Sequence, residues 1–226
     1  MKLIHGDLNY SSWSMRPWLV LTHFDIPFEG ELVRLSGTGW RENLRRKSPT
    51  SRVPVLVDGE LVVPETIAII EYLAELFPEK RIWPADRKAR ALARAASAEM
   101  HSGFNALRNA APCNLRVSKP GRVQPDMVVN DLKRVETLWG GLLDRFGGPY
   151  LTGSAFTAAD AMFAPLASRI RTYELAVSDT AGRYVETIYA LPAFQALLAR
   201  AVAEPTIVER DEIDILLSGR EPQDDS

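Results

Sequence analysis

The apolar residues of this chain change their spacing once, and that change limits the folds open to it. Up to about residue 77, short apolar stretches of strand length alternate with stretches of helical periodicity, and after residue 85 every periodic segment is helical. The boundary at 78–85 holds Pro78 and Pro84. We therefore expect an α/β domain over residues 1–80, an all-α helical bundle over 86–218 and a disordered acidic tail at 219–226.

The first region predicts the element order βαβαββα. Strands are expected at 2–5, 28–35, 53–57 and 60–63, and helices at about 15–24, 40–47 and 66–77. The pair Asp58-Gly59 between two apolar runs is a hairpin signal, which makes the last two strands antiparallel neighbours in a mixed four-stranded sheet. Pro17 is tolerable only in the first turn of its helix.

The second region predicts a long helix that Asp86 caps and whose apolar stripe continues to Leu107. Further helices are expected at 125–146, 157–173, 179–190 and 192–203, after a loop at 111–124. On the long helix that Asp86 caps, the spacing of His101, Phe104 and Arg108 predicts that they share one face.

Charge and composition exclude several classes of function. The chain has 27 Lys plus Arg against 29 Asp plus Glu, and a net charge of −2 provides no basic field for nucleic acid. One cysteine, Cys113, and three scattered histidines predict neither a disulfide nor a metal site. The start lacks the apolar core of a signal peptide, and no apolar run is long enough to cross a membrane, so we expect a cytoplasmic protein.

Three serines surround the first strand-to-helix turn, at Ser11, Ser12 and Ser14. A hydroxyl at this place lies beside the positive end of the helix dipole, which favours a bound anion. The alternative is simple N-capping by one serine. No cysteine stands in the turn, so dithiol exchange there is excluded and any thiol in the chemistry must come from the ligand.

Two further segments of the first region have both a structural and a functional interpretation. Pro54 after Arg52 and Val53 is either a trans proline at a strand entrance or a cis bond that exposes the Val53 backbone to a peptide. Glu65 and Thr66 before the third helix form either a cap or a carboxylate-sized anion site. In the second region, residues 157–160 read as a capping box, which is purely structural.

Taken in order, these markers resemble the cytosolic glutathione transferase family over nearly the whole chain. The markers are a hydroxyl after the first strand, Val53-Pro54, the run ETIAIIEYL from Glu65 and the capping box at 157–160. Within the family, SSWSMRPWLVL from Ser11 resembles the SSCS-x-R-x-R start of the zeta class, the maleylacetoacetate isomerases. Trp13 stands where that class has its cysteine.

The resemblance implies a thioredoxin-like fold for the first domain, a homodimer, and glutathione as co-substrate without a metal. It further implies a small hydrophobic electrophile, and the expected apolar surface with one cation suits an electrophile that carries an acidic group. The charge balance and the lack of a long apolar run already argue against nucleic-acid and membrane partners. The residues implied are Ser11 and Ser12 for catalysis; Trp13, Arg52, Val53, Pro54, Glu65 and Thr66 for glutathione; and His101, Phe104 and Arg108 for the electrophile.

Three functions remain open: a transferase that conjugates glutathione, a zeta-like glutathione-dependent cis–trans isomerase, and a non-catalytic glutathione-binding module. The activating hydroxyl is also open. An ungapped alignment favours Ser11, with Ser14 as the helix cap. Ser12 replaces Ser11 if the turn is shifted by one residue, and Tyr10 is the activator if its ring points inward.

Overall fold

The computed structural model of the chain describes residues 1–214, so the expected tail at 219–226 and the end of the expected second domain lie outside the described residues. The first seven elements follow the predicted order βαβαββα. They are β1 (Lys2–His5), α1 (Ser12–His23), β2 (Glu29–Leu32), α2 (Trp40–Lys47), β3 (Val55–Asp58), β4 (Leu61–Pro64) and α3 (Thr66–Leu76).

The four strands form the predicted mixed sheet, with the order β2-β1-β3-β4. Strand β1 pairs in parallel with β2, where Leu3 lies opposite Gly30, and antiparallel with β3, where Leu3 lies opposite Leu56. Strand β4 pairs antiparallel with β3, and Asp58 lies opposite Leu61 across the predicted turn. Gly59 in this turn has a φ of 59°, which glycine adopts without steric cost.

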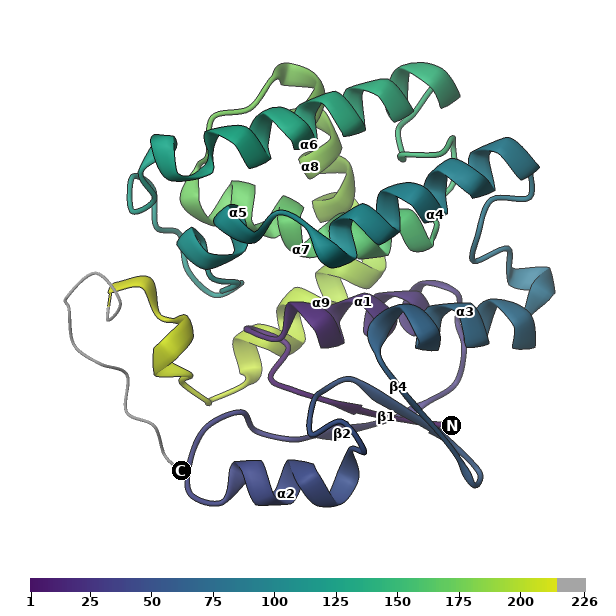
Figure 1. Ribbon diagram of the computed structural model, residues 1–226, viewed down its shortest axis with the longest axis vertical. Helices are drawn as coiled ribbons and strands as arrows, with labels where there is room; N and C mark the ends of the chain where they lie inside the picture. The colour runs from purple at the N-terminus through teal and green to yellow at the C-terminus, as the bar shows by residue number, and fades with distance from the viewer. Residues whose placement is uncertain (215–226) are drawn as a thin grey trace.

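Helices cover both faces of this sheet (Figure 1). Alternate residues of a strand point to opposite faces, so Leu3 of β1 packs in the main core with Met15 of α1, and α3 adds Ile70 to the same core. On the other face, Ile4 packs with Leu44 of α2 in a smaller cluster. The first helix is thereby fixed between the sheet and the rest of the chain.

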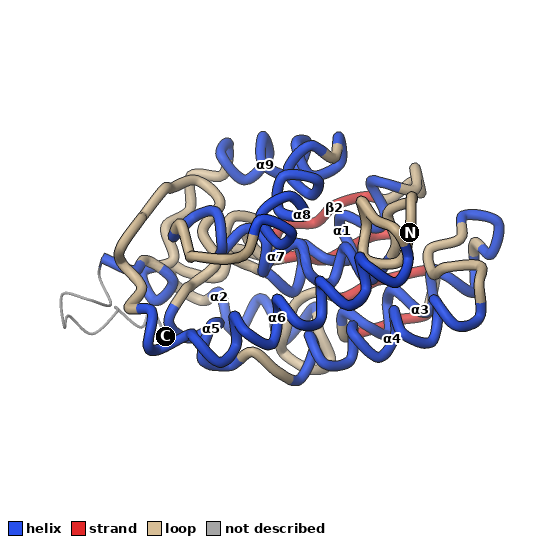
Figure 2. Tube along the Cα trace, turned by 90° about the horizontal axis from the view of Figure 1, so that it is seen from above, coloured by secondary structure: helices blue, strands red, loops and turns tan. Residues whose placement is uncertain are grey.

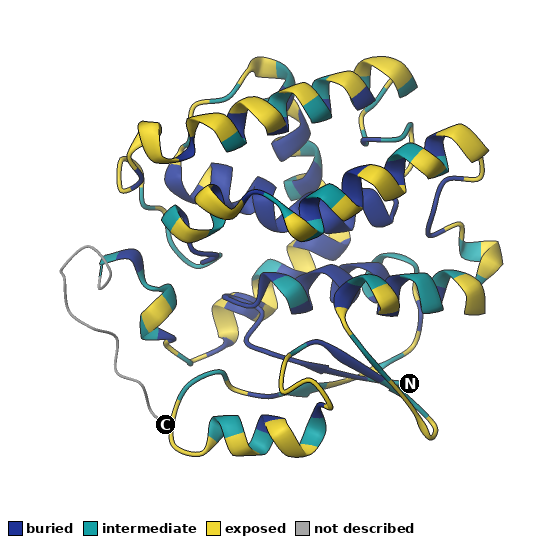
Figure 3. Ribbon diagram, in the orientation of Figure 1, coloured by how far each residue is buried: buried dark blue, intermediate teal, exposed yellow. Residues whose placement is uncertain are grey.

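The remaining elements are helical, as predicted, and they pack around one central helix. They are η1 (Pro78–Lys80), α4 (Arg87–Ser102), α5 (Asn105–Ala110), α6 (Pro125–Phe146), α7 (Ala158–Tyr173), α8 (Asp179–Ala190), α9 (Pro192–Ala203) and η2 (Glu209–Asp211). Every residue of α7 except Arg171 is buried, and α7 contacts α1, α4 and α8 (Figure 3). In the view from above, the strands lie beneath the helices (Figure 2).

The capping box at the start of α7 is confirmed. Asp160 is fully buried, and its carboxylate accepts hydrogen bonds from the backbone N–H groups of Thr157 and Leu151, both at 2.9 Å, and from the hydroxyl of Tyr184 at 3.0 Å. Burial raises the pKa of this carboxyl group, and the hydrogen bonds oppose that effect. These contacts anchor the helix against which α1 packs.

The prediction of one continuous helix from residue 87 to Leu107 is wrong. Helix α4 ends at Ser102, and Phe104 has the left-handed φ of 58° before α5 begins at Asn105. The Phe104 ring is buried in the core, where it forms a T-shaped pair with Phe163 and 6.3 Å separates the two ring centroids. Core packing of this ring accompanies the break, and His101, Phe104 and Arg108 therefore do not share one helical face.

Candidate active site at the start of the first helix

The serine turn is more tightly organised than a single N-cap. Helix α1 begins at Ser12, and Ser11 is its N-cap: the Ser11 hydroxyl accepts from the Ser14 backbone N–H at 3.3 Å. The same hydroxyl donates to the Ser14 Oγ at 2.9 Å, which also accepts from the Gly6 N–H at 3.0 Å. The expectation that Ser14 is the cap is wrong. The Ser12 hydroxyl makes no side-chain hydrogen bond to any residue within 1–214.

Pro17 lies in the second turn of α1 and not in the first, because the helix starts earlier than predicted. Proline has no N–H, so the Trp13 carbonyl four residues before it lacks its helical donor. The buried hydroxyl of Thr66 replaces that donor and bonds to the Trp13 oxygen at 3.0 Å. This bond ties the start of α3 to the serine turn, across 53 positions of sequence.

Glu65 and His101 meet across the two regions of the chain. The Glu65 carboxylate accepts from the Thr66 backbone N–H at 3.0 Å, and its other oxygen lies 3.1 Å from the His101 Nε2. The His101 ring also forms a T-shaped pair with Trp13, with 5.1 Å between the centroids. These groups line a cavity of about 580 Å³, together with Thr50, Arg52, Val53, Pro54 and Ser102. The Val53–Pro54 bond at its wall is cis.

A second cavity of about 340 Å³ adjoins the first, since Trp13, Arg52 and Val53 line both. It contains the serine pair. Its other lining residues come from α2, α5, α7, η2 and the loops between elements: Tyr10, Leu35, Trp40, Leu44, Ser51, Arg108, Pro112, Cys113, Arg169, Arg210 and Asp211. The Trp13 ring stands at the junction. The guanidinium carbons of Arg16 and Arg108 lie 4.3 Å and 4.6 Å from its centroid, within the range of a cation–π contact.

Three arginines near the second cavity are paired with backbone carbonyls. Arg108 donates to the Gly103 and Met100 oxygens, and Arg169 donates to the Ala111 oxygen at 2.7 Å. Fully buried Arg16 donates through Nε to the Met162 oxygen at 2.9 Å, and within residues 1–214 its two terminal nitrogens have no hydrogen-bond partner. Arg16, Arg108 and Arg169 make no ion pair with a carboxylate of the described residues.

Burial, and after it the clustering of these cations, disfavours their charged forms. Burial and then repulsion by Arg169 lower the pKa of Arg108 to about 10. Burial, followed by repulsion from Arg108 and Arg169, lowers the pKa of Arg16 well below its ordinary value. A bound anion opposes both effects, because an opposite charge favours the protonated guanidinium. The electrostatics of the second cavity therefore suit a ligand that carries a negative charge.

The Tyr10 hydroxyl is hydrogen-bonded to residues of other segments. Its hydroxyl donates to Glu212 at 2.5 Å and accepts from Arg116 at 2.7 Å. Burial and the bond to Glu212 raise the pKa of Tyr10 to about 12. A tyrosine that activates a thiol donates its proton toward the sulfur, and here that proton is directed to a carboxylate.

The structure brings together most of the residues singled out from sequence. Nine of them line the two cavities: Ser11, Ser12, Trp13, Arg52, Val53, Pro54, Glu65, His101 and Arg108. Thr66 lies buried beneath them, and Phe104 lies in the core. His101 lines the cavity of Glu65, whereas Arg108 lines that of the serines.

Sequence reasoning missed Arg16, Arg169 and Arg210. The first two interrupt otherwise apolar helices, in WSMRPWLVL and APLASRI, and a lone arginine inside such a stripe is a usable signal of a buried charge. No comparable signal marks Arg210, which follows the last long helix.

No group of three or more His, Cys, Asp or Glu side chains within residues 1–214 is placed to hold a metal ion. No helix in the same range is both long enough and apolar enough to span a membrane.

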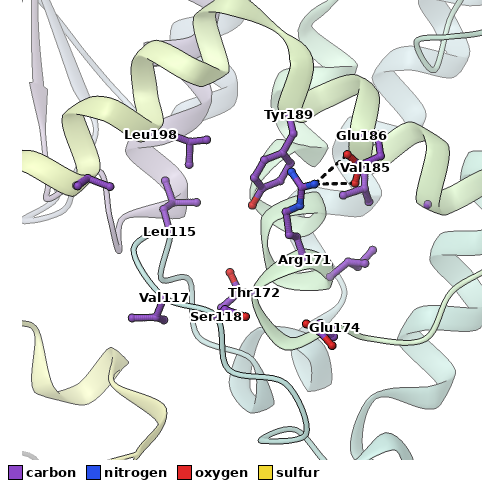
Figure 4. A pocket seen from close by; sticks show the side chains of 13 residues that line it. Leu115, Val117, Ser118, Arg171, Thr172, Glu174, Val185, Glu186, Tyr189 and Leu198 are labelled. Atoms are coloured by element: carbon purple, nitrogen blue, oxygen red, sulfur yellow. Dashed lines mark hydrogen bonds and ion pairs between the residues drawn. The ribbon is translucent and has the colours of Figure 1, made fainter.

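A third cavity, of about 630 Å³, lies away from the residues predicted from sequence (Figure 4). It is bounded by α7, α8, α9 and the loop around Val117, and Arg171 crosses it to bond both carboxylate oxygens of Glu186 at 2.9 Å. The Arg171 guanidinium also lies 4.0 Å from the Tyr189 ring centroid. Because Glu186 neutralises Arg171, this cavity differs from the serine site, where Arg108 and Arg169 are not paired with a carboxylate of residues 1–214.

Comparison with known proteins agrees with the fold. The family model for the glutathione S-transferase N-terminal domain matches residues 10–76, which include the serine turn and Thr66. A probable maleylacetoacetate isomerase of Caenorhabditis elegans is 33% identical over 191 residues, covering 82% of this chain and 86% of the relative. Glutathione S-transferase 1 of Dianthus caryophyllus is 32% identical over 167 residues, covering 73% of this chain and 75% of the relative.

Solved structures give the same result. A glutathione transferase homologue from Burkholderia with bound glutathione has a TM-score of 0.66 and 28% identity, covering 88% of this chain and 97% of the other. A bacterial maleyl pyruvate isomerase of the zeta class has a TM-score of 0.70, covering 92% of this chain and 100% of the other. Its sequence is 23% identical, so this similarity supports the fold alone. The sequence and structural relatives agree, and this chain belongs to the glutathione transferase family.

Proposed function

We propose that this chain is a glutathione transferase that activates the glutathione thiol through its serine turn for attack on an electrophile carrying an acidic group. The observation that carries the proposal is the position of Ser11 and Ser12. They lie at the N-terminus of α1 and line the arginine-rich cavity, which shares Trp13, Arg52 and Val53 with the cavity of Glu65.

In this proposal glutathione extends along the shared wall. The Val53 backbone pairs with the cysteinyl residue, Glu65 and Thr66 bind the γ-glutamyl end, and Arg52 binds the glycyl carboxylate. The Glu65 carboxylate now occupies the Thr66 N–H, so it must turn aside to admit the γ-glutamyl carboxylate. The Thr66 hydroxyl holds the Trp13 carbonyl and thereby positions the turn that receives the sulfur.

The chemistry of the serine turn is to stabilise a thiolate. A free thiol has a pKa of about 8.5, so only a few per cent is ionised at neutral pH. A hydroxyl donor and the N-terminus of α1 both favour the anion. Since Ser14 Oγ is fixed by the Gly6 N–H, rotation of the two hydroxyls lets Ser14 donate to Ser11 and Ser11 donate to the sulfur.

The conjugation step then follows from the charges. The thiolate forms a carbon–sulfur bond with the electrophile, whose leaving group departs with the bonding electron pair. Arg108 and Arg169 hold the acidic group of the electrophile and do not exchange protons with it. The Trp13 ring, which stacks with Arg108, supplies the apolar wall at the junction.

A second candidate is a zeta-like isomerase, which the similarity to a probable maleylacetoacetate isomerase favours. In that reaction the thiolate adds to a double bond, the new single bond rotates, and elimination returns glutathione unchanged. The two reactions are separated by product analysis: a transferase consumes glutathione stoichiometrically, whereas an isomerase converts maleylacetoacetate without consuming it. A non-catalytic module binds glutathione and does neither.

The test of glutathione binding is calorimetry with the purified chain. We expect measurable heat at millimolar glutathione or below, and Thr66→Val is expected to weaken binding about fivefold, because the hydroxyl that supports the Trp13 carbonyl is lost. Thr66→Ser keeps the hydroxyl and serves as the matched control, with affinity close to that of the wild type. Absence of heat and of competition at millimolar glutathione would refute the proposed function.

We also propose that the chain forms a homodimer. Leu61 and Val62 of β4 and Leu76 of α3 are 47%, 42% and 44% exposed, which leaves apolar surface on this edge of the molecule. Self-association about a two-fold axis is the commonest way to cover such a surface. Sedimentation at micromolar concentration is expected to show twice the chain mass, and a 25.2 kDa species would contradict the proposal.

A further inference from the structure

The segment after α9 also contributes residues to the cavity that contains Ser11 and Ser12. Residues 204–214 follow α9 as the last yellow part of the described chain (Figure 1). Arg116 holds the beginning of this C-terminal segment by donating to the Glu204 and Thr206 carbonyl oxygens at 2.6 Å and 2.9 Å. Because Arg116 also donates to the Tyr10 hydroxyl, the segment and the turn share one anchor.

The far end of the C-terminal segment is anchored as well. Glu212 accepts from the Tyr10 hydroxyl and, at 3.0 Å, from the Asn114 side chain. Asp214 pairs with Lys119 and lies 3.1 Å from the Arg122 Nε. The short helix η2 lies between these two anchors, so the positions of its residues relative to the serine turn are fixed by side-chain contacts on both sides.

Arg210 on η2 lines the same cavity as Ser11 and Ser12. Its guanidinium carbon lies 5.1 Å from the ring centroid of Trp40, which lines the cavity from α2. Its Nε lies 3.8 Å from an oxygen of the adjacent Asp211, which is beyond hydrogen-bond distance. The Arg210 side chain is 45% exposed, so a ligand in the cavity can reach it.

The other charges of the cavity leave room for an anion beside Arg210. Arg52, Arg108 and Arg169 add positive charge, and Asp211 is the acidic residue among the lining residues that the structure describes. Burial raises the pKa of the Asp211 carboxyl group, which weakens its competition for Arg210.

We propose that Arg210 binds a carboxylate of the ligand in this cavity, so that the C-terminal segment completes the site and selects acidic ligands. The inference rests on the proposed function. Two carboxylates have the required chemistry: the acidic group of the electrophile, and the glycyl carboxylate of glutathione, which is expected near Arg52. Both are planar anions that a guanidinium can bind through two parallel hydrogen bonds.

The experiment compares Arg210→Gln with the wild type in the full chain, using each carboxylate and its ester. One arm measures KM for chlorodinitrobenzoate and for its methyl ester, and the other measures KM for glutathione and for its glycyl monoester. We expect Arg210→Gln to raise KM about tenfold for the carboxylate in one arm, and to leave kcat and the KM of the matching ester within twofold of the wild type. Arg210→Lys is expected to raise the same KM nearly as much, because an ammonium group cannot form the two parallel hydrogen bonds of a guanidinium. The arm that responds identifies the carboxylate.

Arg183→Gln is the matched control, because Arg183 is an exposed arginine of α8 that bonds to Thr180. The inference is overturned if Arg210→Gln matches the wild type in both arms, or if acid and ester change equally. A wild-type chain that binds no glutathione refutes the proposed function and this inference with it. A wild-type chain that binds glutathione, with an Arg210→Gln variant indistinguishable from it, refutes only the role of Arg210.

Discussion

Replacement of Ser11 by alanine is expected to raise the pKa of bound glutathione by about one unit, which lowers the thiolate fraction at neutral pH by at most about tenfold. The shift corresponds to about 1.4 kcal/mol of lost thiolate stabilisation. The physical reason is the loss of one hydroxyl donor at the N-terminus of α1, while the helix dipole remains. Thiolate absorbance against pH measures the shift directly.

Ser11 has a second role that this experiment must separate from the first. As the N-cap of α1 it accepts the Ser14 N–H, and removing such a cap costs about 1 kcal/mol of stability. Glycine replaces a capping serine at a cost of only a few tenths of a kcal/mol. Ser11→Gly is therefore expected to shift the titration as much as Ser11→Ala, but to unfold at nearly the same urea concentration as the wild type.

Ser12 and Tyr10 are the competing donors. The Ser12 hydroxyl lines the same cavity and is not used in the cap, so it is the stronger rival. Tyr10→Phe is expected to leave the glutathione titration unchanged, because that hydroxyl bonds to Glu212 and Arg116. If Ser12→Ala shifts the titration and both Ser11 variants leave it in place, the thiol donor is Ser12.

The fold was predictable because its signals are local. Alternation of strand and helix periods, the Asp58-Gly59 turn and the capping box at Thr157 each depend on a few neighbouring residues, and each is found where expected. The break after Ser102 was not predicted, because the apolar stripe continues through it. The left-handed Phe104 coincides with packing against Phe163, and that contact joins residues 59 positions apart.

The start of α1 also depends on a contact between residues that are distant in the sequence. A proline in the second turn of a helix is unfavourable from local rules alone, since it removes the donor for the Trp13 carbonyl. The hydroxyl of Thr66 supplies a donor from another helix, and nothing in the sequence near Pro17 reveals it. Motif residues such as Glu65 were found because they lie next to helix starts, whereas Arg169 and Arg210 join the site only through tertiary packing.

Arg16 is expected to limit the stability of the unliganded protein. The charge is fully buried, its terminal nitrogens lack partners within the described residues, and Arg108 and Arg169 repel it. Isolated buried charges cost several kcal/mol, and apolar replacements of similar volume are often stabilising. Arg16→Met forfeits the hydrogen bond to the Met162 carbonyl and the contact with Trp13, so we expect a net gain of about 1–2 kcal/mol in urea unfolding.

Although Arg16→Met is expected to be more stable, we expect it to bind acidic ligands less tightly than the wild type does. If the Arg16 charge is retained to attract an anion, chlorodinitrobenzoate should raise the melting temperature of the wild type more than that of Arg16→Met, because a ligand stabilises the state that binds it. Its methyl ester should shift both proteins equally. An Arg16→Met variant that is less stable than the wild type, or that responds to acid and ester alike, would contradict this account. A variant that is more stable, and that has lost only the preference for the acid, would show that the buried charge is kept for its ligand and at the expense of the fold.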